Sequence, residues 1–151
     1  MVKVKIDNAK GLVQSAGNGV SIENQVTLRD MVWATEAVTG AGALSTTVPV
    51  SLIDTTGGAA AITLGDGGVG GQVKFIAMIK DAGDATLTLD GSAAGAGASD
   101  TYTFANVGET LLLVWVVDED GTAVGWAEVS RGSGANAAAG AVAGLPVATT
   151  A

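Results

Sequence analysis

Glycine is the residue that most constrains the fold of this chain. Twenty-three of its 151 residues are glycine, and they divide it into short runs of apolar and β-branched residues. These runs have the length of β-strands, and the glycine- and aspartate-rich stretches between them have the composition of turns. Because no strand-helix-strand rhythm is present, we predict an all-β fold, with an antiparallel β-sandwich or barrel-like domain.

Seven of these runs fall between residues 46 and 131, which we predict to be the β-domain. Leu111 to Val117 is continuously apolar, so we expect it to be the central strand, covered on both faces. The turns Asp81-Ala82-Gly83-Asp84 and Asp118-Glu119-Asp120-Gly121 are each expected to close a hairpin. The predicted strands are Val48 to Ile53, Ala61 to Leu64, Gln72 to Ile79, Ala85 to Leu89, Thr101 to Phe104, Leu111 to Val117 and Ala123 to Val129.

The flanking regions have different patterns. In residues 1–45, alternation predicts strands at Val2 to Ile6 and Val20 to Leu28, joined by a turn at Ala16 to Gly19. The stretch Arg29 to Val38 suits a short helix capped by Asp30 as well as a strand, and both alternatives stay open. Residues 132–151 are almost wholly small, which suits either an extended Gly/Ala-rich arm docked on a neighbouring subunit or a loose terminus.

Composition narrows the classes of function. The chain has no histidine and no cysteine, which removes the commonest proton shuttle and the soft metal ligand, so we expect no enzyme, no metal site and no cofactor. Its formal charge of −8 repels phosphate backbones and anionic lipids, so nucleic acid and membranes are not expected partners. The apolar run Leu111 to Val117 is also far shorter than the roughly 20 residues that span a bilayer. The start, Met1 to Asp7, alternates like a strand and lacks the apolar stretch of a secretory signal.

Two motifs resemble ligand sites. Gly65-Asp66-Gly67-Gly68-Val69-Gly70-Gly71 contains a G-x-G-x-x-G pattern, but a strand-like segment follows it where a dinucleotide site needs a helix, so we predict a connecting loop. Asp118 to Gly121, with Glu128 nearby, resembles part of a calcium loop. Placing Gly121 at the sixth loop position puts Val116 and Ala127 at the first and twelfth, which excludes an EF-hand. We expect an exposed hairpin turn, with a looser surface calcium site as the minor alternative.

The remaining candidate groups are charged or aromatic. Carboxylates and lysines such as Lys74, Lys80, Asp81 and Asp84 show no pairing in the sequence, and we expect them to be surface charges. Trp115 and Trp126 are expected to pack in the core. Trp33 and Tyr102 remain as candidates for an exposed recognition patch.

The stretch Leu52 to Val129 resembles a small β-domain that recurs in virion structural proteins of tailed bacteriophages. The resemblance rests on Ile53 to Leu64 with the following glycine-rich loop, then Gly71-Gln72-Val73-Lys74-Phe75-Ile76 and Gly83 to Leu89, and finally Phe104-Ala105-Asn106-Val107-Gly108-Glu109-Thr110 with the strand ending in Trp115. It implies a non-enzymatic subunit of decoration or fibre type.

The resemblance and the composition together favour a capsid decoration, or cement, protein. We expect a homotrimer on the outer capsid surface that contacts the major capsid protein and bridges neighbouring capsomers, so that many weak contacts act together. The N-terminal region and the C-terminal arm are the expected contact regions. The alternative is a tail-associated or fibre module that binds a host-surface glycan or protein.

Overall fold

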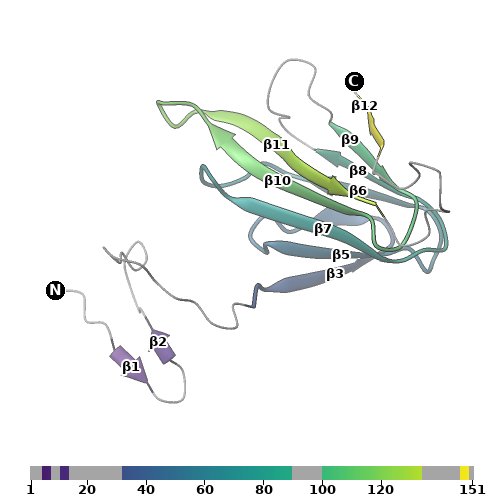
Figure 1. The fold of residues 1–151 in the computed structure, drawn as a ribbon, viewed down its shortest axis with the longest axis horizontal. Helices are drawn as coiled ribbons and strands as arrows, with labels where there is room; N and C mark the ends of the chain where they lie inside the picture. Colours follow the sequence, from purple (N-terminus) through teal and green to yellow (C-terminus); the bar gives the residue numbers. More distant parts are fainter. Residues whose placement is uncertain (1–4, 8–10, 14–31, 90–99, 134–146, 150–151) are drawn as a thin grey trace. The chain divides into compact units, whose positions relative to one another are not determined.

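The computed structural model describes residues 5–7, 11–13, 32–89, 100–133 and 147–149 (Figure 1). The chain divides into two compact units, Met1–Val32 and Trp33–Ala151. In the first unit, β1 (Lys5–Asp7) pairs antiparallel with β2 (Gly11–Val13), and Lys5 lies opposite Val13. The first predicted strand therefore overlaps β1, whereas the predicted turn at Ala16 to Gly19 and the strand Val20 to Leu28 lie outside the described residues.

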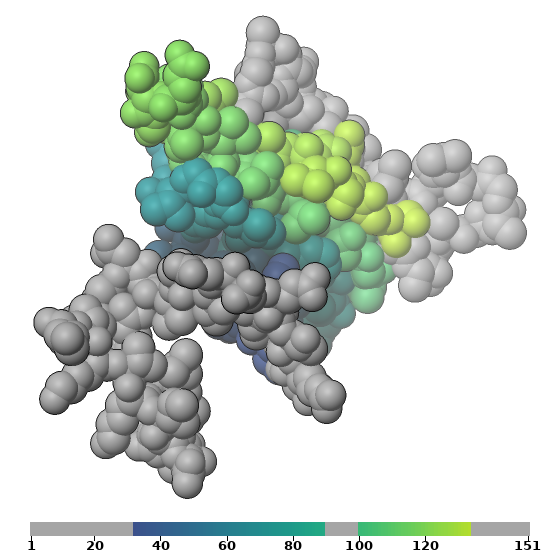
Figure 2. Space-filling model, turned by 60° about the vertical axis from the view of Figure 1, so that its left-hand side comes forward, coloured from purple at the N-terminus to yellow at the C-terminus, as the bar shows by residue number. Residues whose placement is uncertain are grey.

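The second unit contains two five-stranded sheets (Figure 1). The first sheet has the order β11-β10-β7-β5-β3, and the second has the order β12-β9-β8-β6-β4. Figure 2 shows the unit in space-filling form, with the late strands in green to yellow-green. The strands are β3 (Thr35–Thr39), β4 (Gly42–Leu44), β5 (Val50–Asp54), β6 (Ala60–Leu64), β7 (Val73–Lys80), β8 (Ala85–Leu89), β9 (Thr101–Phe104), β10 (Thr110–Val117), β11 (Ala123–Gly132) and β12 (Val147–Thr149).

The all-β prediction is confirmed for the described residues, but the antiparallel prediction is wrong for half of each sheet. The chain passes repeatedly from the first sheet to the second, in the arches β3-β4, β5-β6 and β7-β8, and successive arches pair in parallel. Asp81-Ala82-Gly83-Asp84 therefore joins two sheets and does not close a hairpin. A short glycine-aspartate turn permits either connection, because it reverses the chain without choosing a partner strand.

The last strands return in the opposite direction. β9 pairs antiparallel with β8, and β10 pairs antiparallel with β7. The turn Asp118 to Gly121 does close the predicted hairpin between β10 and β11. Three residues of the predicted C-terminal arm, in β12, pair with β9 of the same chain. The two sheets are separate and do not close, so the barrel-like alternative is wrong and the arrangement resembles a sandwich.

The core lies between the two sheets, where alternate side chains of each strand are buried. The central strand of the first sheet is β7, not β10 as predicted. In β10, Leu111, Leu113 and Trp115 are buried, whereas the intervening side chains are only half-buried. The continuous apolar run therefore reflects one core face and one apolar outer face, rather than burial on both sides.

The predicted strands match the observed ones closely in position. Arg29 to Val38, for which both helix and strand stayed open, includes the first four residues of β3. The strand β4 was not predicted, because Gly42-Ala43-Leu44 is too short to show alternation. Nowhere in the described ranges is there a helix long and apolar enough for a membrane span.

Candidate functional site

Lys74 is the most deeply buried charged side chain among the described residues. It shares the inward face of β7 with Ile76 and Met78, and it is fully buried. Its ammonium donates to Glu36 Oε1 at 3.0 Å, to the Ser45 carbonyl at 2.6 Å and to the Val48 carbonyl at 2.7 Å. An ammonium has three N–H groups, so these three acceptors saturate it.

Glu36 completes the cluster from β3. Its carboxylate accepts from the Ser45 backbone N–H at 3.0 and 3.2 Å and from the Ser51 hydroxyl. Burial raises the pKa of Glu36, but the hydrogen bonds from Ser51, Lys74 and Ser45, together with the Lys74 charge, outweigh burial and leave that pKa below its ordinary value. Burial lowers the pKa of Lys74, and Glu36 offsets this only in part.

Lys74, Glu36, Ser45, Val48 and Ser51 form a hydrogen-bonded group that we call the lysine cluster. It joins β3, β5 and β7 to the connection between β4 and β5, and each ammonium proton is already bound. The prediction that Lys74 is a surface charge is wrong. Its position in phase with Ile76 and Met78 was the sequence signal for burial, but Glu36 lies 38 residues away and nothing in the local pattern indicated it.

A second set of contacts stacks the arches on one another at their turns. Gly40 N–H donates to the Asp54 carbonyl at 3.1 Å, Thr55 N–H to the Lys80 carbonyl at 3.1 Å, and Ala60 N–H to the Asp84 carbonyl at 2.9 Å. Lys80 also pairs with Asp54 at 2.8 Å. Lys80, Asp81 and Asp84 are exposed, which confirms that they are surface charges, although nothing in the sequence indicated the pair with Asp54. The hydrogen bond from Lys80, followed by those from Thr56, lowers the pKa of Asp54 to about 2.

The arch between β9 and β10 is held by a buried acid that sequence reasoning missed. Glu109 accepts from Ala105 N–H at 2.7 Å and from the Asn106 amide at 2.9 Å. The preceding Gly108 has φ of +88°, which favours glycine, and its N–H donates to the Met78 carbonyl at 2.8 Å. The Val107-Gly108-Glu109 motif is thereby explained as turn chemistry.

Apart from the pair Asp54 and Lys80 at the arch end, the outward side of the first sheet has an uncharged surface, which we call the apolar face. Backbone register places Ser130, Leu112, Phe75, Val50 and Thr35 in one row across the five strands. A second row is formed by Gly132, Thr110, Ala77, Leu52 and Ala37. The apolar face consists of these ten residues with Val73, Ile79, Val114, Val116, Gly125 and Ala127.

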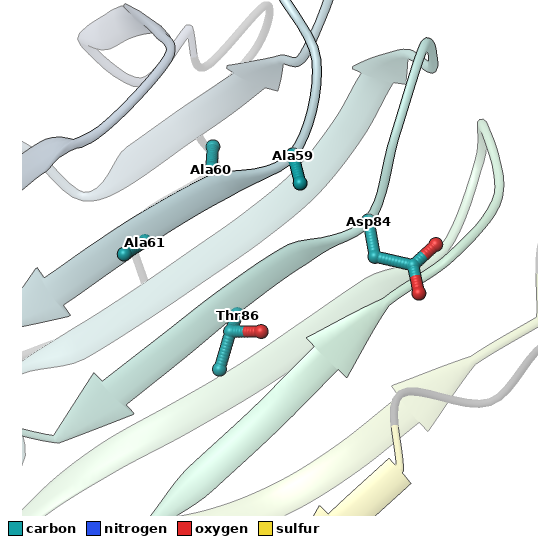
Figure 3. A pocket seen from close by; sticks show the side chains of 5 residues that line it. All are labelled: Ala59, Ala60, Ala61, Asp84 and Thr86. Atoms are coloured by element: carbon teal, nitrogen blue, oxygen red, sulfur yellow. The ribbon is translucent and has the colours of Figure 1, made fainter.

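Apart from Asp84 at its arch end, the outward side of the second sheet consists of hydroxyl and methyl groups, and we call it the threonine face. One row across β4, β6, β8 and β9 is Ala43, Thr63, Thr88 and Thr101, and a second is Ala61, Thr86 and Thr103. An open hollow of about 320 Å³ lies at the arch end of this face (Figure 3). It is lined by Ala59, Ala60, Ala61, Asp84 and Thr86.

The loop Gly65 to Gly71 and the turn Asp118 to Gly121 are a connecting loop and a hairpin turn, as predicted. Gly65 to Gly71 connects β6 to β7, and a Cβ added at Gly67 would lie 2.4 Å from Trp115 Cγ. These glycines therefore allow the loop to lie on the core. Asp118 Oδ1 accepts from the N–H groups of Asp120 and Thr122 at 3.0 and 2.7 Å, as in a hairpin turn. The described residues contain no group of three or more candidate metal ligands.

The aromatic predictions have mixed outcomes. Trp115 and Trp126 are each 2% exposed and pack edge to face with ring centroids 5.3 Å apart, which confirms their place in the core. Trp126 Nε1 also donates to the Gly65 carbonyl at 2.9 Å. Tyr102 is buried, and burial, followed by the charge of Glu128, raises its pKa to about 12, so its proposed place in an exposed patch is wrong. Trp33 is 43% exposed.

Comparison of the chain with protein families and with curated proteins found no match.

Proposed function

We propose that this chain is a non-enzymatic structural subunit of a tailed-phage virion, which decorates and stabilises the capsid by bridging neighbouring capsomers as a homotrimer. The observation that carries the proposal is that the two outer faces of the sandwich, apolar on one side and threonine-rich on the other, have charged side chains at their arch ends, Lys80 with Asp54 and Asp84, but not in the cross-strand rows described above. A subunit of formal charge −8 that packs among neighbours needs such surfaces, because charged ones would repel its own copies.

The interior chemistry is consistent with a mechanical role. The buried Lys74 and Glu109 side chains are engaged in hydrogen bonds that join strands or close arches. Such ties strengthen a small domain that has no disulfides. The partner in this role is the major capsid protein on the outer surface of the head, and repeated weak contacts around a cyclic oligomer supply the stabilisation.

Immunogold electron microscopy of intact virions, with antibody raised against the recombinant chain, tests the proposal. Label distributed evenly over heads is the expected result. Particles lacking the protein should then release DNA at a lower temperature than complete particles. Absence of label from virions overturns the proposal.

The alternative is a tail-associated or fibre module that binds a host-surface glycan or protein. The exposed Trp33 is the observation that favours it, since an exposed indole can stack on a sugar ring. Label confined to the tail, together with loss of adsorption in a Trp33→Ala phage, would establish this alternative. Label over heads and normal adsorption of the variant would exclude it.

A further inference from the structure

The β3-β4 arch, which we call the first arch, lies at one end of the stack of arches. In the part of the chain that the structure describes, β3 pairs only with β5, over five residues, and β4 pairs only with β6, over three. The turn between β3 and β4 adds the hydrogen bond from Gly40 N–H to the Asp54 carbonyl at 3.1 Å. Elements with so few neighbours are the ones that open locally before a whole domain unfolds.

The first arch also contributes little to the hydrophobic core. Leu44 is the one buried apolar side chain that its described residues supply, and Val38 is partly buried. The β5-β6 and β7-β8 arches contribute many more buried apolar side chains. These are Ile53, Ala60, Ile62, Leu64, Ile76, Met78, Ala85, Leu87 and Leu89. Because the burial of apolar surface supplies most of the stabilisation of a packed element, the first arch is held more weakly than the other two.

Glu36 supplies polar contacts to an arch that has few apolar ones. From β3, its carboxylate accepts from Lys74 Nζ on β7 at 3.0 Å and from the Ser51 hydroxyl on β5. It also accepts from the backbone N–H of Ser45, the residue that follows β4, at 3.0 and 3.2 Å. One carboxylate therefore connects both strands of the first arch to each other and to the next two strands of the first sheet.

We propose that the first arch is an acid-sensitive conformational switch, which opens as a unit while the rest of the sandwich stays folded and which the Glu36 carboxylate keeps closed. Opening converts β5 and β6 into edge strands, and the backbone groups exposed on such edges can pair with another chain. The proposal goes beyond the virion role and does not depend on it, because it concerns the folding of the isolated chain.

Acid acts on this switch through the charge of Glu36. Lys74 is the charged group that faces Glu36, and its other partners, Ser51 and Ser45, are neutral. Although burial raises the pKa of Glu36, the hydrogen bonds from Ser51 and Lys74 keep that pKa below its ordinary value of 4.5. The stabilisation from the carboxylate is therefore present above pH 4.5 and is lost as the pH falls through the lower pKa of the folded chain. Protonation also leaves the buried Lys74 ammonium without its counter-charge.

Hydrogen–deuterium exchange of the full chain, read by mass spectrometry of its peptides, tests the proposal. At pH 7, Glu36→Gln should speed exchange of the β3 and β4 amides together by at least tenfold relative to those of β7 and β8. Glu109→Gln is the matched control, because it makes the same change at the buried acid of the β9-β10 arch, and it should leave the first arch as in the wild type. In the wild type, lowering the pH from 7 to 3 should reduce protection of the first arch more than that of β8, after correction for the intrinsic exchange rate.

Near-ultraviolet circular dichroism of the packed pair Trp115 and Trp126 reports whether each variant is folded. If Glu36→Gln does not fold, Ser51→Ala, which removes one donor to the same carboxylate, replaces it in the same experiment. Equal acceleration of exchange in every strand would overturn the proposal, because Glu36 would then act on global stability. Exchange in the first arch that either the variant or acid leaves unchanged would also overturn it, as would acceleration in β3 without β4.

Discussion

Single glycines in this chain differ in what surrounds them, and Gly67 is the most tightly enclosed by a side chain in the core. A Cβ at Gly67 would lie within 2.4 to 2.8 Å of three Trp115 atoms, whereas one at Gly68 would meet only Gln72 Oε1 at 3.8 Å. We expect Gly67→Ala to lower the free energy of unfolding by about 1–3 kcal/mol through overpacking. Gly68→Ala is the control and should have little effect. Urea unfolding followed by tryptophan fluorescence measures both, and equal stability of the two variants would contradict the explanation.

Lys74 is the charged residue whose loss should destabilise the protein most. Lys74→Met keeps the length of the side chain but leaves Glu36 and two carbonyls without their donor. Breaking a buried pair in this way should lower the free energy of unfolding by about 3 kcal/mol. Lys80→Met is the matched control, because Lys80 is 62% exposed and solvent screens its pair with Asp54. The same urea measurement checks this, and similar losses in both variants would argue against a structural lysine cluster.

At the scale of the element, the arches depend on close approach of their turns. A Cβ at Gly83, in the β7-β8 arch, would lie 2.5 Å from the backbone nitrogen of Ala59, in the β5-β6 arch. We expect Gly83→Ala to lower the thermal unfolding midpoint by several degrees, since backbone cannot move aside as a side chain can. Gly57→Ala, with no atom within 4 Å, should leave the midpoint nearly unchanged. Calorimetry measures the unfolding midpoints of both variants. Equal midpoints would contradict the tight packing of these two turns.

The arch end should also be the acid-sensitive part of the sandwich. The pKa of Asp54 is about 2 in the folded chain and 3.8 in an ordinary environment, so its contribution to stability is present above about pH 4 and disappears as the pH falls toward 2. Asp54→Asn should therefore be less stable than the wild type at pH 6, and the difference should shrink at pH 2.5. Urea midpoints at both pH values measure it. A difference in stability that does not change with pH would contradict the lowered pKa of Asp54.

At the scale of the whole molecule, the sandwich contains its own core. The buried apolar residues from Leu44 to Trp126, and the lysine cluster, all lie within the unit Trp33–Ala151. We expect a fragment of residues 33–151 to unfold cooperatively with nearly the midpoint of the full chain. Calorimetry of both proteins tests this, and a large drop in the fragment's midpoint would show that residues 1–32 stabilise the sandwich.

Much of the strand layout follows from the sequence by itself, because alternation and turn chemistry act over a few residues. Ala85 to Leu89 and Thr101 to Phe104 were predicted with their observed bounds, and Trp115 and Trp126 were correctly expected in the core. The hairpin at Asp118 to Gly121 was also predicted correctly, because its turn depends on local residues. The Asp118 side chain accepts a backbone hydrogen bond, and Gly121 has the positive φ that the turn requires.

Which strands become neighbours was decided only in the tertiary structure. The turn Asp81 to Asp84 has hairpin composition but crosses between sheets, because β7 and β8 bury their apolar faces against opposite sides of one core. Lys74 and Glu36 meet only when β3, β5 and β7 lie side by side in parallel. Contacts between residues tens of positions apart depend on this pairing, and local periodicity carries no information about it.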